Sequence, residues 1–292
     1  MDWAKSFQHA IDYMEAHITE PPDYARIGQE MHVSGFYFQK IFSILCGIAP
    51  GEYIRNRRLT LAGNELLSTD AKIIDIALKY GYDTPEGFTR AFTRFHGVTP
   101  NAARKNALPL RSFSRLSISI SVKGGSSMQY KIEHKEAFQI MAKTQRFVKI
   151  EDIVGRKDIP RFWADCHLDG TVAYLSQAAK KDGVLQGSIV GMCTEDSTVV
   201  KDFPYSIGAE YAGGEVPEGY ALFDVPAATW MIFAVESGQP QDIQALLHRV
   251  FSEFFPASDY KPIGTYDLEV YSPGCAYGQA YDSEVWIAVT KK

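Results

Sequence analysis

Two carboxylates stand beside aromatic residues in apolar, strand-like segments near the end of the sequence. Glu269 precedes Tyr271 by two positions, and Glu284 precedes Trp286 by two. Side chains two apart in a β-strand share a face, so each pair should present a carboxylate together with an aromatic ring. A carboxylate is a counter-ion and an aromatic face attracts cations, which favours a receptor for an organic cation. The same spacing fits a solvated sheet face above an aromatic core equally well.

The second half of the chain is rich in further aromatic residues, and three of them complete the predicted effector-binding set: Trp163, Tyr205 and Trp230. The sequence contains no Gly-x-Ser-x-Gly nucleophile motif, no phosphate-binding loop and no His-x-x-x-His metal pair. We therefore expect no catalytic residue, no metal ligand and no cofactor.

The first half contains a duplicated pattern. The spacing Phe-x-x-x-Phe-x-x-x-x-Gly-x-x-Pro occurs twice, fifty residues apart, at Phe38, Phe42, Gly47 and Pro50 and at Phe88, Phe92, Gly97 and Pro100. A fixed period indicates one supersecondary unit built twice. Each copy reads as a helix-turn-helix whose second helix is predicted over about 35–46 or 84–95, with the phenylalanines packed inward.

The faces opposite those phenylalanines should point outward and could read DNA. They form the predicted DNA-binding set: Phe36, Gln39, Lys40 and Ser43 in the first unit, and Pro85, Glu86, Thr89 and Arg90 in the second. Gln, Lys and Arg hydrogen-bond base edges in the major groove, whereas Ser and Thr contact phosphates. Three arginines on the helix predicted to join the units, Arg55, Arg57 and Arg58, are expected to be structural or solvated.

The joining helix, predicted from Pro50 to Ser68, would be ~27 Å long at ~1.5 Å per residue. This length is near the ~34 Å between successive major-groove faces on one side of a DNA duplex. One chain could therefore reach two adjacent grooves without forming a dimer.

Residues 24–104 resemble the DNA-binding domain of the AraC/XylS family of transcription regulators. The strongest matches are Ile-Ala-Leu-Lys-Tyr-Gly-Tyr-Asp at 76–83, Phe-Thr-Arg-Ala-Phe at 88–92 and Gly-Val-Thr-Pro at 97–100. Lys40 stands where the family usually has arginine. A lysine cannot match the bidentate contact of arginine with guanine, which favours a phosphate contact for the first unit.

After residue 107 the character of the sequence changes. Leu116, Ile118, Ile120 and Val122 alternate with serines and predict a strand, and Gly and Ser residues near 124–127 indicate a flexible linker. From residue 128 onward, strand-like and helical segments alternate as roughly β-α-β-β written twice. The fold class expected is an all-α tandem helix-turn-helix domain followed by an α+β domain of duplicated β-α-β-β units.

Residues 128–292 resemble the GyrI-like effector-binding domain found in regulators of the BmrR and Rob type. The resemblance rests on the duplicated layout, on Phe-Pro-Tyr-Ser-Ile-Gly at 203–208, on Asp-Val-Pro-Ala at 224–227 and on the final Glu-x-aromatic strand. It implies that Glu269 contacts the ligand and that Glu284 matches a second acidic position. Some stand-alone relatives resemble hydrolases with a Trp and a Glu in the pocket, so the resemblance keeps a hydrolase as an alternative.

Charge is distributed unequally between the two halves. The net charge is −5, but residues 1–125 carry 15 Lys and Arg against 12 Asp and Glu, whereas residues 126–292 carry 15 against 23. A mildly basic first half suits DNA, and an acidic second half suits a neutral or cationic partner. The apolar runs fall far short of the ~20 residues that cross a bilayer. Four isolated cysteines fit a reduced, cytoplasmic setting.

The sequence thus predicts a DNA-binding domain over 1–107, a linker over 108–127 and an effector-binding domain over 128–292. The expected function is sequence-specific transcriptional regulation through double-stranded DNA, controlled by a small cationic or aromatic effector. RNA polymerase is a further candidate partner, and no membrane partner is expected. Two alternatives for the second domain remain open: a hydrolase of reactive small molecules, and a protein-docking scaffold.

Overall fold

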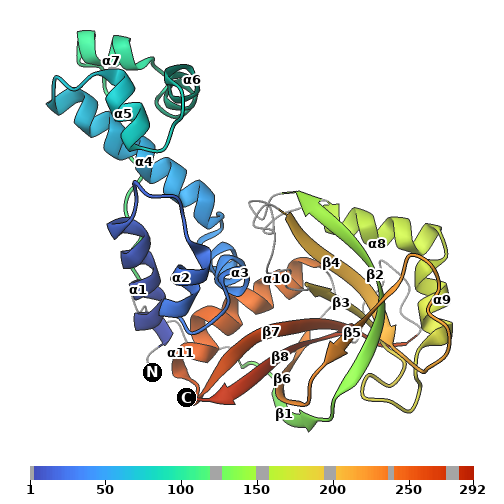
Figure 1. The fold of residues 1–292 in the computed structure, drawn as a ribbon. Coiled ribbons are helices and arrows are strands. Elements are labelled where there is room, and N and C mark those ends of the chain that lie inside the picture. Colours follow the sequence, from blue (N-terminus) through green and yellow to red (C-terminus); the bar gives the residue numbers. More distant parts are fainter. Residues whose placement is uncertain (1–2, 119–126, 149–157, 194–201, 236–239, 274–282) are drawn as a thin grey trace.

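The computed structural model describes residues 3–118, 127–148, 158–193, 202–235, 240–273 and 283–292. The first part is helical and the rest is built on one sheet (Figure 1). The helices of the first part are α1 (Trp3–Ala16), α2 (Tyr24–Glu30), α3 (Gly35–Cys46), α4 (Pro50–Ser68), α5 (Ile73–Lys79), α6 (Pro85–His96) and α7 (Pro100–Asn106). The predicted helices over 35–46 and 50–68 are confirmed at the same residues.

The two helix-turn-helix units use the same local chemistry. The Ser34 hydroxyl accepts a hydrogen bond from the Tyr37 backbone nitrogen at the start of α3, and Thr84 does the same for Gly87 at the start of α6. Each helix ends at a glycine in the left-handed region, Gly47 or Gly97, where a side chain would be strained. The repeated glycines are therefore helix stops, and the repeated phenylalanines are fully buried, as predicted.

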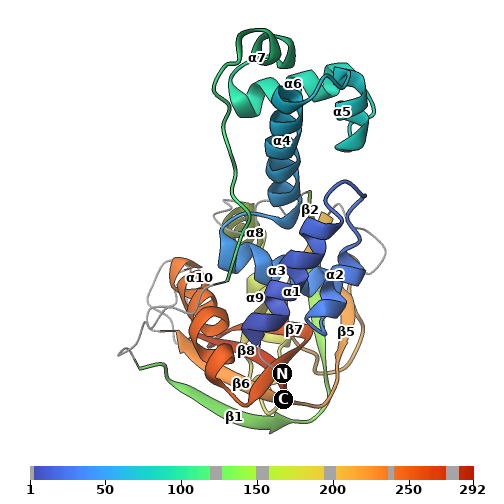
Figure 2. The ribbon, with the colours of Figure 1, turned by 90° about the vertical axis from the view of Figure 1, so that its left-hand side faces the viewer.

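Helix α4 separates the two units. Helices α5, α6 and α7 lie at its far end, away from the sheet (Figures 1 and 2). They pack around their own core, which includes Leu59, Leu66, Phe88 and Phe92. The first unit, by contrast, packs against the sheet domain.

The sheet domain contains eight strands in the described residues, and every described strand pair is antiparallel. The strands are β1 (Tyr130–Lys135), β2 (Phe138–Val148), β3 (Ile189–Cys193), β4 (Asp202–Glu210), β5 (Ala221–Val225), β6 (Ala228–Val235), β7 (Tyr260–Tyr271) and β8 (Ser283–Lys291). The helical segments are α8 (Asp158–Leu168), α9 (Thr171–Ala178), α10 (Pro240–Arg249), the π-helical turn η2 (Val250–Phe254) and α11 (Phe255–Ala257). The spatial order is β1-β6-β8-β7-β3-β4-β2-β5.

This order shows a duplicated unit with exchanged edges. Strands β2, β3 and β4 with helices α8 and α9 form one half, and strands β6, β7 and β8 with α10 form the other. The edge strand β1 precedes β2 in the chain but pairs with β6, while β5 precedes β6 but pairs with β2. The predicted β-α-β-β duplication is confirmed. In addition, each half is bordered by an outer strand, β1 or β5, that comes from the other half in chain order. The two halves meet where β3 pairs with β7.

The predicted strand at Leu116 and Ile118 is wrong. The chain there belongs to no sheet: the Leu116 nitrogen donates to the Tyr53 hydroxyl at 3.2 Å, and the Ile118 nitrogen donates to Gln8 Oε1 at 2.7 Å. Side chains of the helical domain thus satisfy this backbone in place of a neighbouring strand. Ile120 and Val122 lie outside the described residues.

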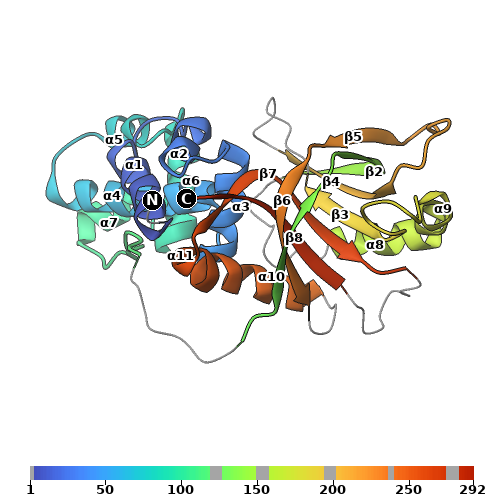
Figure 3. The ribbon, with the colours of Figure 1, turned by 90° about the horizontal axis from the view of Figure 1, so that it is seen from below.

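One hydrophobic core joins the first helix-turn-helix unit to the second half of the sheet domain. It contains Phe7, Phe38 and Phe42 from the helices together with Phe233 and Phe251 from β6 and η2. Helix α3 contacts α10 and η2, and α1 contacts α11. The Trp3 indole nitrogen donates to the Phe251 carbonyl at 3.1 Å across this junction. Seen from below, the helical domain and the sheet lie side by side (Figure 3).

Candidate functional site

The outward face of α6 is open to solvent. Glu86 and Arg90 are exposed, and Pro85 and Thr89 are half-buried. Phe88 and Phe92 hold the opposite face in the core of the second unit. The four residues predicted for DNA contact in this unit are thus on one accessible helix face, at the end of the molecule farthest from the sheet (Figure 2).

The matching face of α3 is buried. Gln39, Lys40 and Ser43 are only 7%, 8% and 2% exposed. Phe36 is half-buried and packs against an aromatic cluster of the sheet domain that includes Trp163 and Tyr205. The expectation that these residues face outward is not met in this arrangement, in which α3 packs against α10 and η2 of the sheet domain.

Asp267 on β7 binds the covered face of α3. Lys40 Nζ lies 2.8 Å from Asp267 Oδ2, and the Tyr37 hydroxyl donates to Asp267 Oδ1 at 3.1 Å. Burial alone would lower the pKa of Lys40, but the charge and hydrogen bond of Asp267, together with the nearby Cys193 and Glu269, outweigh burial and raise that pKa above its usual range. Gly264, at φ +82°, lets β7 approach α3, since a Cβ there would lie 3.2 Å from the Tyr37 ring. No sequence pattern pointed to Asp267, because its partners lie some 230 positions away in the chain.

Glu269 lies two residues farther along the same face of β7, inside a hydrogen-bonded aromatic cluster. The Tyr205 hydroxyl donates to Glu269 Oε2 at 2.7 Å, and the Tyr271 hydroxyl donates to the same oxygen at 3.2 Å. Trp163 Nε1 donates to the Tyr205 hydroxyl at 3.0 Å, and the Trp163 and Tyr271 rings meet edge to face with centroids 5.0 Å apart. Four of the seven predicted effector residues therefore form one site.

Burial raises the pKa of Glu269, although hydrogen bonds from Tyr205 and Tyr271 and the charge of Lys40 act in the opposite direction. Gly191 on β3, directly paired with Glu269, makes room for this cluster. A Cβ at Gly191 would lie 2.1 Å from the Tyr205 hydroxyl and 3.0 Å from Glu269 Oε2. A carboxylate that burial disfavours, enclosed by aromatic rings, is suited to bind a cation that restores its counter-charge.

The other three predicted effector residues lie on the opposite face of the sheet. Glu284 pairs with Val270 in the β7–β8 register, so its side chain points away from the Glu269 side. Trp286 and Trp230 pack together there, with ring centroids 5.9 Å apart, in a core separate from the Glu269 cluster. The two carboxylate–aromatic pairs therefore cannot form one pocket, because the strand register places them on different faces.

This opposite-face group already holds cations from the chain itself. Lys131 Nζ lies 3.2 Å from Glu284 Oε1, and Lys135 Nζ lies 5.3 Å from the centre of the Trp286 ring. The Trp286 indole nitrogen donates to Glu284 Oε2 at 2.7 Å. Both lysines come from the edge strand β1. A carboxylate and an aromatic ring do attract cations here, but the contacts join β1 to β8.

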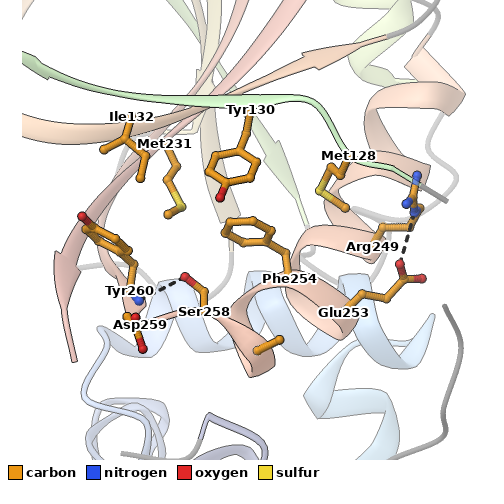
Figure 4. A pocket seen from close by; sticks show the side chains of 11 residues that line it. Met128, Tyr130, Ile132, Met231, Arg249, Glu253, Phe254, Ser258, Asp259 and Tyr260 are labelled. Carbon is orange, nitrogen blue, oxygen red and sulfur yellow. Dashed lines mark hydrogen bonds and ion pairs between the residues drawn. The ribbon is translucent and has the colours of Figure 1, made fainter. Parts of the chain in front are cut away.

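A separate cavity of about 430 Å³ opens between β1 and the helical segment η2–α11 (Figure 4). Its walls combine apolar and polar side chains, with Tyr130 facing Phe254 at a centroid distance of 4.7 Å. Arg249 and Glu253 form an ion pair at the rim, with 3.4 Å between nitrogen and oxygen. None of the predicted effector residues lines this cavity.

The joining helix α4 uses its arginines for structure, as predicted for Arg57 and Arg58. Arg57 Nε lies 2.8 Å from Glu15 Oε1, and Arg58 Nε donates to the Ile18 carbonyl at 2.6 Å. These bonds fix α4 to α1 and to the turn that follows it. Among the described residues, no helix has the length and apolarity to span a membrane, and no cluster of His, Cys, Asp and Glu is arranged to hold a metal.

Comparison with known proteins identifies both domains. A helix-turn-helix domain profile matches residues 27–106, and a GyrI-like small molecule binding domain profile matches residues 128–290. The regulatory protein SoxS of Salmonella typhimurium is 35% identical over 104 residues, which cover 36% of this chain and 97% of SoxS. The transcriptional regulator Rob of the same organism is 33% identical over 107 residues, and the match covers 37% of each chain.

Other relatives share one domain at a time. The HTH-type regulator YbfP of Bacillus subtilis is 38% identical over 104 residues, which span about a third of its length (35%). Among solved structures, SAV2435 bound to tetraphenylphosphonium aligns with 56% of this chain and 94% of its own, at 17% identity and a TM-score of 0.47. An AraC-type regulator from Chromobacterium violaceum aligns with 35% of this chain and 91% of its own, at 26% identity and a TM-score of 0.33.

The tandem units with their shared caps and glycine stops, the duplicated sheet, and the matches to both profiles agree on one assignment. The chain belongs to the AraC-type helix-turn-helix regulators that carry a C-terminal GyrI-like small-molecule-binding domain.

Proposed function

We propose that this protein is a sequence-specific transcriptional regulator whose effector is an organic cation bound at Glu269. The observation that carries the proposal is the cluster at Glu269, in which a partly buried carboxylate is surrounded by Tyr205, Tyr271 and Trp163. Both tyrosine hydroxyls donate to Oε2, so a ligand would approach Oε1 and the aromatic faces. Counter-charge and cation–π attraction would then act together.

Support for DNA binding comes from the second helix-turn-helix unit. Its α6 face, with Thr89 and Arg90, is accessible, and the 19-residue helix α4, about 27 Å long at ~1.5 Å per residue, separates it from the first unit. Two recognition helices at this spacing fit successive major-groove segments on one side of a duplex. RNA polymerase, recruited at a promoter, is a further proposed partner.

The effector class is tested by calorimetry with tetraphenylphosphonium, a bulky aromatic cation, and with tetraphenylborate, an anion of the same shape. We expect the cation to bind the full chain and the anion not to bind. The Glu269→Gln variant should lose about tenfold or more in affinity, because it keeps the shape and hydrogen bonds but lacks the charge. Glu284→Gln is the matched control, since it removes the same charge from the opposite face. Equal affinity of Glu269→Gln and the wild type would disprove the assignment of Glu269.

A hydrolase that acts on reactive small molecules is the second candidate. It is favoured by the continuous chain of hydrogen bonds from Trp163 through Tyr205 to Glu269, whose raised pKa suits a proton donor. Mass spectrometry of electrophilic substrates incubated with the wild type and with Glu269→Gln separates the two candidates. Turnover that depends on Glu269 would support the enzyme, and recovery of intact compound would support the regulator.

A further inference from the structure

Helix α3 packs against the sheet domain beside the proposed effector site. Its face carries Phe36, Gln39, Lys40 and Ser43, the residues that would enter a major groove. In this arrangement α3 contacts α10 and η2, and Phe36 packs against the aromatic cluster around Tyr205. Gln39, Lys40 and Ser43 are each less than a tenth exposed, so a DNA duplex cannot contact them. Helix α3 therefore has to leave the sheet domain before it can read DNA.

Lys40 places a cation beside the proposed effector site. Its ammonium group lies 2.8 Å from Asp267 Oδ2, and Asp267 shares one face of β7 with Glu269. The electrostatic influence of Lys40 reaches Glu269 as well as Asp267. A lysine is rarely buried unless it is paired, so loss of either partner would leave an unpaired buried charge that disfavours the docked arrangement.

We propose that α3 is an internal ligand of the effector site, with Lys40 in the place of the cation, and that an organic cation activates DNA binding by displacing α3. This inference rests on the proposed function and adds the mechanism that couples the two sites. The docked state binds neither the effector nor two grooves of DNA. The undocked state binds both.

Two quantitative consequences follow from this competition. Because the effector and DNA both select the undocked state, each must raise the affinity of the other by the same factor. That factor cannot exceed the inverse of the undocked fraction of the free protein, since full undocking is the most that either ligand can achieve. A substitution that weakens docking should therefore raise the DNA affinity of the effector-free protein and reduce the further gain from the effector.

The decisive experiment compares Asp267→Asn with Asp224→Asn in the full-length chain. Asp224 is exposed on the edge strand β5, where it accepts a hydrogen bond from Gln139 at 2.8 Å, so its substitution removes the same charge far from α3. The DNA probe is a duplex selected from a random-sequence library, and affinity is measured by fluorescence anisotropy with and without tetraphenylphosphonium. We expect Asp267→Asn to bind the duplex about tenfold or more tightly without the cation, because breaking a buried ion pair favours undocking. Asp224→Asn should match the wild type, and the cation should increase its affinity for DNA.

A second measurement uses the unmodified chain and does not depend on a variant that folds. Acylation of lysines followed by mass spectrometry reports whether Lys40 is accessible, with the exposed Lys105 on α7 as the internal reference. Lys40 should react slowly in the free protein, and at least severalfold faster when tetraphenylphosphonium is added.

The outcomes separate this inference from the function on which it rests. If the cation binds by calorimetry but leaves both DNA affinity and Lys40 reactivity unchanged, the displacement is wrong and the effector site stands. If the cation lowers DNA affinity, it stabilises the docked state, and the inference is overturned. If the cation does not bind at all, the effector class fails, whereas tighter DNA binding by Asp267→Asn would still support docking of α3 as an internal block.

Discussion

Glu269 is held in a position where its own charge is costly. Gly191 leaves the space that Glu269 and the Tyr205 hydroxyl fill together, and α3 adds a lysine nearby. Burial raises the pKa of Glu269, which means that the folded state favours the protonated form more than the unfolded chain does. Such a residue weakens the fold at neutral pH, as functional residues commonly do.

This leads to a prediction on stability and pH. Between the ordinary glutamate pKa and the raised folded value, the folded protein binds more protons than the unfolded chain. The free energy of unfolding should therefore fall as pH rises through that interval. Glu269→Gln removes the ionisable group and with it this loss of stability. The variant should therefore be more stable than the wild type at pH 7, by about 0.5–2 kcal/mol. Its advantage should shrink toward pH 4.

Urea unfolding between pH 4 and pH 8 checks this prediction, with Glu284→Gln as the control for the loss of one negative charge. A Glu269→Gln variant whose advantage over the wild type stays constant with pH would show that burial of the carboxylate is not the cause.

At the scale of single elements, α6 offers the most direct test of base reading. Arg90 is exposed on the accessible face of α6, and an arginine that contacts guanine typically contributes about 1–3 kcal/mol to discrimination. Arg90→Ala should weaken binding to a selected duplex by this amount and should relax specificity at one base position. Arg94→Ala, one turn farther along α6, controls for the loss of a positive charge.

Binding to a selected duplex and to its single-base variants, measured at one fixed salt concentration, distinguishes base reading from phosphate contact. An equal loss on every sequence would assign Arg90 to the phosphate backbone instead.

The elements themselves were largely predictable, because their signals are local. Serine and threonine caps, glycine stops and apolar periodicity place α3, α4 and α6 within a residue or two of the predicted bounds. The edge strand β1 was missed, since Lys131, Glu133 and Lys135 interrupt its apolar pattern and its stability comes from pairing with β6. Leu116 and Ile118 gave the converse error: their alternation looks like a strand, but side chains of the helical domain satisfy the backbone.

The site was predictable only in part, for reasons that lie beyond local sequence. Spacing shows that Glu269 and Tyr271 share a face, yet it cannot show that Glu284 faces the other way, because that depends on the register between β7 and β8. Nor can the pattern around Lys40 show that Asp267 binds it, since the pair forms only when α3 docks on the sheet domain. The burial of the α3 face around Lys40 can be seen only in the three-dimensional arrangement.

In the whole molecule, the hydrophobic cores do not follow the division into a helical domain and a sheet domain. The first helix-turn-helix unit shares its core with β6, β8 and η2, whereas the second unit has its own. Both ends of the described chain attach to the same short segment, since Trp3 bonds the carbonyl of Phe251 and Lys292 bonds that of Phe255. The second helix-turn-helix unit is therefore accessible to DNA, while the first unit stays packed against the sheet domain.

The exchange of edge strands has a consequence for the integrity of the chain. A break in the exposed loop between Gly213 and Gly214 would separate β1 from its partner β6 and β5 from its partner β2. The first fragment would then contain β1 and the second β5, each without the strand with which it pairs. The unpaired hydrogen-bonding groups of such a strand favour association with the other fragment. We expect the fragments 1–213 and 214–292, when co-expressed with an affinity tag on one, to purify together as a noncovalent pair. Fragments that elute separately would show that the interlocked strands contribute little to the cohesion of the protein.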